Sequence, residues 1–92
     1  MEKPDAQLVS ESILGNQASF EVLVHRYTDS IYGFCLRRTG NVTAAEDCTQ
    51  DTFFKCWKHL SSFDISQASF KTWLFTIARN SITDHLRKKN TL

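Results

Sequence analysis

Apolar side chains recur every three or four residues between Asn16 and Gly40. This spacing places them on one side of an α-helix, whereas a half-buried strand would need apolar and polar residues to alternate. The chain has one proline and three glycines, and no run alternates in the manner of a hairpin. The pattern therefore predicts a long helix over residues 17–39, whose buried stripe is Phe20, Leu23, Val24, Tyr27, Ile31, Phe34 and Cys35.

Residues that favour helix ends place a short helix before the long one. We expect it to cover residues 5–14, with Asp5 as its N-cap and Gly15 closing it. Asn16 is expected to cap the long helix, which ends at Gly40 because glycine tolerates the left-handed backbone of a helix end. The first 40 residues are thus predicted to form two helices.

Two further helices are expected in the second half. Thr43 and Glu46 have the spacing of a capping box, in which a hydroxyl and a carboxylate satisfy the first amides of a helix reciprocally. This pair predicts a third helix over residues 43–60, and helical spacing resumes over residues 69–89. The predicted fold is all-α, a compact four-helix bundle.

The segment between the third and fourth helices, residues 61–68, is polar and rich in capping residues. It also carries two large apolar side chains, Phe63 and Ile65, which are expected to hold the loop in a fixed shape. Neither a repeat nor a low-complexity segment interrupts the chain, so residues 1–92 are expected to form one domain.

Apolar runs are broken within a few residues, far short of the roughly 20 that span a bilayer, so no membrane insertion is expected. The N-terminus lacks the basic and apolar regions of a secretory signal, which favours a cytoplasmic location. Cys35, Cys48 and Cys56 form no C-x-x-C pair and have no histidine at ligand spacing. We therefore expect buried thiols, with no disulfide, metal site or cofactor.

Charge is distributed unevenly although the whole chain is close to neutral. Residues 1–60 carry a net charge of −2, and residues 61–92 carry +3. An acidic first part and a basic end suggest two different partners, and the basic end is the better candidate for contact with phosphates.

The third helix is predicted to have one apolar side, formed by Ala45, Thr49, Phe53, Cys56 and Leu60. Its opposite side gathers Asp47, Gln50, Asp51, Phe54 and Lys58. An exposed phenylalanine in a polar frame is typical of a protein-docking surface. Alternatively, Phe54 packs against a neighbouring helix, and the carboxylates are a solvated face near the positive end of the helix dipole.

The fourth helix is predicted to bury Phe70, Leu74, Ile77, Ala78 and Ser81. Its opposite stripe is polar and basic: Thr72, Thr76, Arg79, Asn80, Thr83 and Arg87. Hydroxyl, amide and guanidinium groups of this kind can hold phosphates and contact base edges, and Phe63 and Trp73 could offer stacking surfaces nearby. Alternatively, the stripe is an ordinary solvated face, the basic residues complement the helix dipole and the aromatic rings belong to the core.

Several strings resemble region two of sigma factors of the extracytoplasmic-function (ECF) group. They are AEDCTQDTF at residues 45–53, WLFTIARN at 73–80 and DHLR at 84–87, with GNQASFE at 15–21 and RY at 26–27 upstream. The resemblance covers nearly the whole chain in the same order and spacing. Cys48 departs from it, since an aliphatic residue is usual there, and this change is expected to affect packing only.

The resemblance implies a helical bundle with two partners, RNA polymerase and promoter DNA. The third helix would dock on a coiled coil of the polymerase's largest subunit through Asp47, Gln50, Asp51, Phe54 and Lys58. The following loop and last helix would bind the non-template strand of the minus-ten element, with Asn80 in a base pocket. The DNA-binding set is Phe63, Asp64, Ile65, Ser66, Ser69, Lys71, Thr76, Arg79, Asn80, Thr83, Arg87 and Lys88.

Two other functions are weighed against this one. A helical interaction module that binds an anti-sigma factor or adaptor would use the Phe54 face and would bind no DNA. An enzyme would have to use Glu21 and His25, or Asp84 and His85, as its acid–base pair. It is not expected, because no phosphate loop or activated nucleophile accompanies either pair. The second, helix-turn-helix domain of such sigma factors is absent from this chain, so a fragment of a longer factor is expected.

Overall fold

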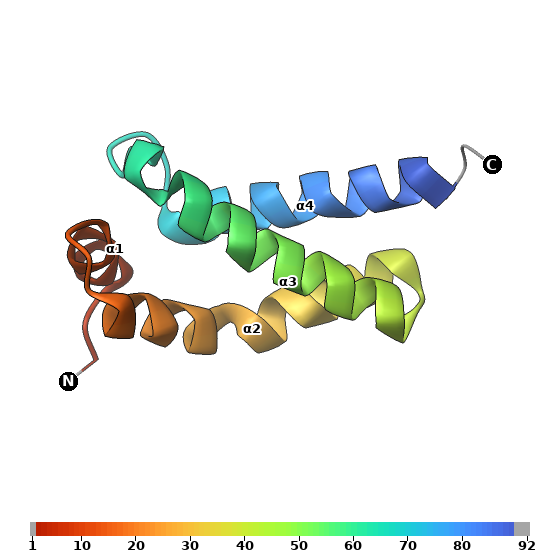
Figure 1. Cartoon of the computed structure of the whole chain (residues 1–92), viewed down its shortest axis with the longest axis horizontal. Coiled ribbons are helices and arrows are strands. Elements are labelled where there is room, and N and C mark those ends of the chain that lie inside the picture. The colour runs from red at the N-terminus through yellow and green to blue at the C-terminus, as the bar shows by residue number, and fades with distance from the viewer. Residues whose placement is uncertain (1, 90–92) are drawn as a thin grey trace.

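The computed structural model describes residues 2–89, and these form four α-helices and one short 3-10 helix. The order is α1 (Asp5–Ile13), α2 (Gln17–Thr39), α3 (Val42–His59), η1 (Leu60–Ser62) and α4 (Phe70–Lys89). Figure 1 shows α2, α3 and α4 lying along one another, with α3 running opposite to the other two and α1 crossing the beginning of α2. The predicted all-α four-helix bundle is confirmed.

One continuous core joins all four helices. Its centre is formed by side chains at most 4% exposed: Leu8, Val9, Leu23, Ile31, Cys35, Ala45, Cys48, Cys56, Leu60, Phe70, Leu74, Ala78 and Ile82. The three cysteines are free thiols in this core, as expected for small apolar residues. Because α1 contributes as well, the short first helix is part of the domain.

The ends of α2 agree with the sequence prediction. Asn16 caps the start, since its side chain accepts a hydrogen bond from the backbone N–H of Ser19 at 3.1 Å. Gly40 ends the helix with a left-handed φ of 66°, and its N–H donates to the carbonyl of Leu36 at 2.8 Å. Gly15 also has a positive φ, 101°, where the chain turns from α1 into α2.

The predicted capping box at Thr43 is wrong. α3 begins one residue earlier, at Val42, and its N-cap is Asn41, whose side chain accepts from the N–H of Ala44 at 2.9 Å. Asparagine caps at least as well as threonine. With Gly40 ending α2, Asn41 is the first residue able to start the next helix, and Thr43 is already inside it.

The predicted N-cap role of Asp5 is also wrong. Pro4 occupies the N-cap position and makes no side-chain cap, while Asp5 lies in the first turn of α1. The Asp5 carboxylate instead accepts hydrogen bonds from Arg26 Nη1 at 2.6 Å and from the hydroxyl of Tyr27. Asp5 therefore joins α1 to α2.

Candidate functional site

The exposed side of α3 gathers the residues expected to bind a protein partner. We call this set the α3 face: Asp47, Gln50, Asp51, Phe54 and Lys58. Phe54 is 64% exposed, so it does not pack into the bundle as the alternative interpretation required. Asp47, Gln50 and Lys58 are exposed around it. The structure thus presents an apolar ring in a polar frame.

Asp51 differs from the rest of the α3 face because it turns toward α4. Its carboxylate accepts a hydrogen bond from Ser81 Oγ at 2.8 Å and pairs with Lys55 Nζ at 2.9 Å. Burial raises the pKa of Asp51, but the bonds from Lys55 and Ser81 outweigh it, so the pKa lies below its ordinary value. Asp51 is therefore an ionised link between α3 and α4.

Trp57 extends the apolar part of the α3 face and was not identified from the sequence. It is 46% exposed and lies three residues after Phe54, on the neighbouring part of the helix surface. Its ring contacts Phe20 of α2, with the ring centroids 4.8 Å apart. The three-residue spacing from Phe54 was the available signal, and the contact with α2 fixes the orientation of the indole.

The outward side of α4 carries the polar and basic residues that the periodicity placed there. We call it the α4 stripe: Thr72, Thr76, Arg79, Asn80, Thr83 and Arg87, all exposed. Thr76 and Thr83 donate to backbone carbonyls one turn earlier, each at 3.0 Å, which leaves their oxygens as acceptors. No described residue hydrogen-bonds to the side-chain amide of Asn80, which lies exposed in the middle of the stripe.

The loop before α4 has a defined shape. Asp64 accepts from the N–H of Ser66 at 2.9 Å and from its hydroxyl at 2.6 Å, and these bonds lower the pKa of Asp64. Ile65, between them, is 50% exposed. Ser69 precedes α4, and its hydroxyl oxygen accepts from the N–H of Thr72 at 3.1 Å. The turn thus presents Ile65 to solvent beside the start of α4.

Phe63 anchors this loop. Its ring stacks on Trp73 with centroids 4.7 Å apart and planes at 28°, and it meets Phe70 nearly edge-on at 6.1 Å. One face of the Phe63 ring is therefore covered, and the ring is half-buried. Phe63 and Trp73 form a supporting aromatic cluster under the loop.

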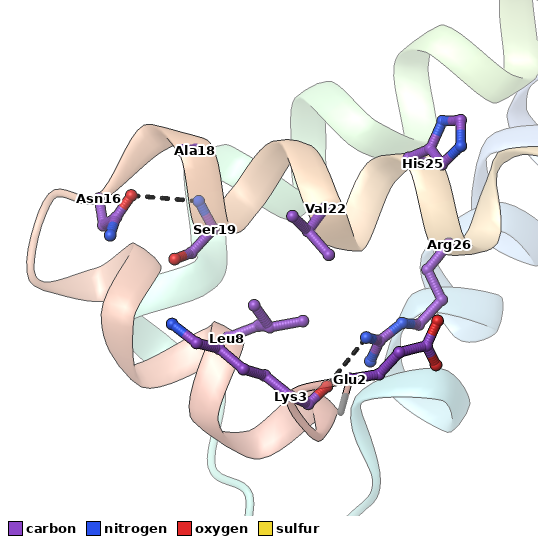
Figure 2. Close-up of a pocket in the computed structure, with 9 residues that line it drawn as sticks. All are labelled: Glu2, Lys3, Leu8, Asn16, Ala18, Ser19, Val22, His25 and Arg26. Atoms are coloured by element: carbon purple, nitrogen blue, oxygen red, sulfur yellow. Dashed lines mark hydrogen bonds between the residues drawn. The ribbon is translucent and has the colours of Figure 1, made fainter.

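Two hollows of the surface involve residues outside these predictions. One, of about 540 Å³, lies between α2 and α4 and brings Arg38 beside Lys71 and Arg79. The other, of about 530 Å³, lies between α1 and α2 (Figure 2). Figure 2 shows Leu8 and Val22 in it, and Arg26 donating to the backbone carbonyl of Lys3. No residue expected to bind polymerase or DNA lines this second hollow.

Neither a metal-binding cluster nor a membrane-spanning helix is found among residues 2–89. There, no three side chains of the metal-ligating types gather closely enough to hold an ion. Over the same residues, every helix is too short or too polar to cross a bilayer.

Comparison with known proteins gives consistent matches. The sigma-70 region 2 family model matches residues 23–91. The chain is 44% identical over 75 residues to the ECF RNA polymerase sigma factor SigW of Bacillus subtilis, covering 82% of this chain and 40% of the relative. It is 38% identical over 73 residues to the ECF RNA polymerase sigma factor RpoE of Cereibacter sphaeroides, covering 79% and 40%. The chain thus spans less than half the length of these relatives.

A solved structure resembles nearly the whole chain. It is the NMR structure of an engineered region 2 of sigmaE in complex with GTAAAA, with a TM-score of 0.88 and 32% identity. The match covers 98% of this chain and 95% of the other.

Proposed function

The chain belongs to the sigma-70 region 2 family, in its ECF group, and from this premise we propose that it acts in transcription initiation through two binding faces. The α3 face docks on RNA polymerase, on a coiled coil of the largest subunit. The α4 stripe and the preceding loop bind the non-template strand of the promoter's minus-ten element. The observation that carries the proposal is the likeness to an engineered region 2 of sigmaE in complex with GTAAAA.

The proposed DNA role is capture of a base that has left the duplex. Unstacking a base costs a few kcal/mol, so a domain that holds it outside the stack favours the melted state. Asn80 is exposed and has both donor and acceptor atoms, which suits recognition of a base edge. Arg79, Arg87 and Lys88 hold phosphates, which fixes the register of the strand without selecting a sequence.

The proposed polymerase contact centres on Phe54. An exposed aromatic ring among polar groups is the usual composition of a binding hot spot, and Trp57 enlarges the apolar area that a partner would cover. Asp47, Gln50 and Lys58 supply polar contacts at the rim, while Asp51 contributes from its position against Ser81. An anti-sigma factor that covered Phe54 would compete with polymerase for the same face.

The proposed role requires binding and no chemistry by the chain itself, and it places the protein with polymerase in the cytoplasm. Melting is driven by the free energy of strand capture, so no catalytic residue or cofactor is needed.

Fluorescence anisotropy can test both faces with one set of proteins. Labelled single strands with minus-ten and scrambled sequences report on DNA, and a labelled fragment carrying the polymerase coiled coil reports on docking. Asn80→Ala is expected to lower discrimination between the strands by about 1 to 3 kcal/mol, the usual value of a base contact. Phe54→Ala is expected to weaken docking by about tenfold or more.

Val42→Ala is the matched control for docking, because Val42 is also exposed and apolar but begins α3, outside the α3 face. It should leave both affinities unchanged. If the wild type ignores every strand and binds only proteins, the interaction-module alternative replaces the DNA role.

A further inference from the structure

The hollow between α2 and α4 is lined by three cations and no carboxylate. Arg38 comes from α2, and Lys71 and Arg79 come from α4. None of the ion pairs found among residues 2–89 involves these three side chains. Three uncompensated positive charges around one hollow of about 540 Å³ favour an anionic occupant.

Aromatic rings fix the geometry of this hollow. Phe34 of α2 and Phe75 of α4 meet edge to face, with centroids 5.3 Å apart. The guanidinium carbon of Arg38 lies 4.7 Å from the centroid of the Phe34 ring, so a cation–π contact holds Arg38 in place. No carboxylate in the described part of the chain forms an ion pair with this guanidinium.

The helix directions bring the cations together. α2 and α4 run the same way in Figure 1, and Arg38 and Arg79 each lie four residues after the aromatic residue of their own helix. Arg38 and Arg79 therefore both lie on the C-terminal side of the Phe34–Phe75 contact. Lys71 lies on its N-terminal side, one turn before Phe75.

The spacing of the charges favours a polymer over a small anion. Lys71 and Arg79 are eight residues apart on α4, which is about 12 Å along a helix axis. A nucleic-acid strand in duplex geometry carries one phosphate per about 3.4 Å of axis, so this distance matches several consecutive phosphates.

We propose that the α2–α4 hollow holds the phosphate backbone of a DNA strand, and that Arg38 of α2 is a DNA-contacting residue beside Lys71 and Arg79. This inference rests on the DNA binding proposed above. Arg79 belongs to both the hollow and the α4 stripe, so a strand on the stripe continues into the hollow. The contact is to phosphates and therefore independent of base sequence.

The test compares Arg38→Gln with Arg37→Gln in the full chain. Arg37 is the matched control because it is the adjacent arginine and exposed, and its Nη1 lies against Gly33, outside the hollow. Anisotropy titrations with minus-ten single strands, scrambled single strands and duplexes are repeated over a range of salt concentrations. Circular dichroism confirms that both variants are folded.

Arg38→Gln is expected to weaken binding severalfold on every sequence and to reduce the slope of log K against log salt by about 1. Arg37→Gln should keep the wild-type slope. If the affinity falls only for single strands, a single-stranded backbone occupies the hollow. If it falls for duplexes as well, the hollow also accepts duplex DNA. Equal behaviour of the two variants would overturn the proposal.

A wild-type chain that binds no oligonucleotide would refute the proposed DNA role, and the hollow itself is then tested separately. Pyrophosphate is titrated while the side-chain Nε–H signals of the arginines are followed by NMR. Shifts of Arg38 and Arg79 without Arg37 support a phosphate site. If the signals of Arg38 and Arg79 do not shift selectively, the proposed phosphate site is overturned.

Discussion

At the scale of single residues, Asp5 shows how one carboxylate holds two helices together. It accepts from Arg26 Nη1 at 2.6 Å and from the hydroxyl of Tyr27, so two side chains of α2 converge on the first turn of α1. Asp5 and Arg26 are each 24% exposed, which screens their attraction less than at a fully solvated position. The short helix is thus held by polar contacts as well as by Leu8 and Val9 in the core.

This arrangement predicts that the free energy of unfolding depends on pH through the ionisation of Tyr27. Burial and then the hydrogen bond to Asp5 raise the pKa of Tyr27 to about 12, above the ordinary value of about 10. The unfolded chain therefore loses this proton first as the pH rises, so the contribution to stability is complete below about pH 10 and is lost between about 10 and 12. At about pH 11 the loss is on the order of 1 kcal/mol.

Tyr27→Phe should remove the part of the stability loss at alkaline pH that the ionisation of Tyr27 causes. Urea unfolding at about pH 9 and about pH 11 measures it as the change in the free energy of unfolding, wild type against variant. Tyr32→Phe, which removes a phenol that does not contact Asp5, is the matched control. Equal alkaline losses in wild type and Tyr27→Phe would contradict the assignment.

At the scale of elements, the four helices were predictable, but the N-caps of α1 and α3 were not. The spacing of buried residues along α2, α3 and α4 indicates helices directly, because each helix covers the core with a stripe that repeats every three to four residues. A cap depends on one side chain, and the region after Gly40 offers two good candidates, Asn41 and Thr43. Only the backbone path decides between them.

The two candidates give opposite predictions for mutation. Asn41→Ala removes the acceptor for the N–H of Ala44 and should cost about 1 kcal/mol of unfolding free energy. Thr43→Ala lies within the first turn and should change it by about 0.5 kcal/mol or less. Urea denaturation followed by circular dichroism measures both. A larger loss for Thr43→Ala would restore the capping box.

The candidate site was predictable where it lies on one helix. Periodicity alone put Phe54 and Asn80 on exposed surfaces, and the structure places both there. It could not show that Asp51 bonds to Ser81, because that contact joins residues thirty positions apart. Arg38 was missed for the same reason, since the hollow that it shares with Lys71 exists only after α2 packs on α4.

At the scale of the whole molecule, the two binding faces depend on one thin core. The bundle is 45 Å long and only 24 by 20 Å across, so each helix has one side in the core and another in solvent. The α3 face and the α4 stripe are the outer sides of helices that meet at Cys48, Asp51 and Ser81. Loosening the contact between α3 and α4 would therefore displace the α3 face and the α4 stripe together.

We therefore expect the chain to unfold in a single transition. Trp57 lies on α3 against Phe20 of α2, and Trp73 lies on α4 against Phe63, so the two tryptophans report on different parts of the bundle. Trp57→Phe leaves the signal of Trp73, and Trp73→Phe leaves that of Trp57. Within each variant, the urea midpoints from fluorescence and from far-ultraviolet circular dichroism should coincide, as in a two-state domain of this size. Midpoints that differ within one variant would mean that one helix pair unfolds separately, and each binding face would then have its own stability.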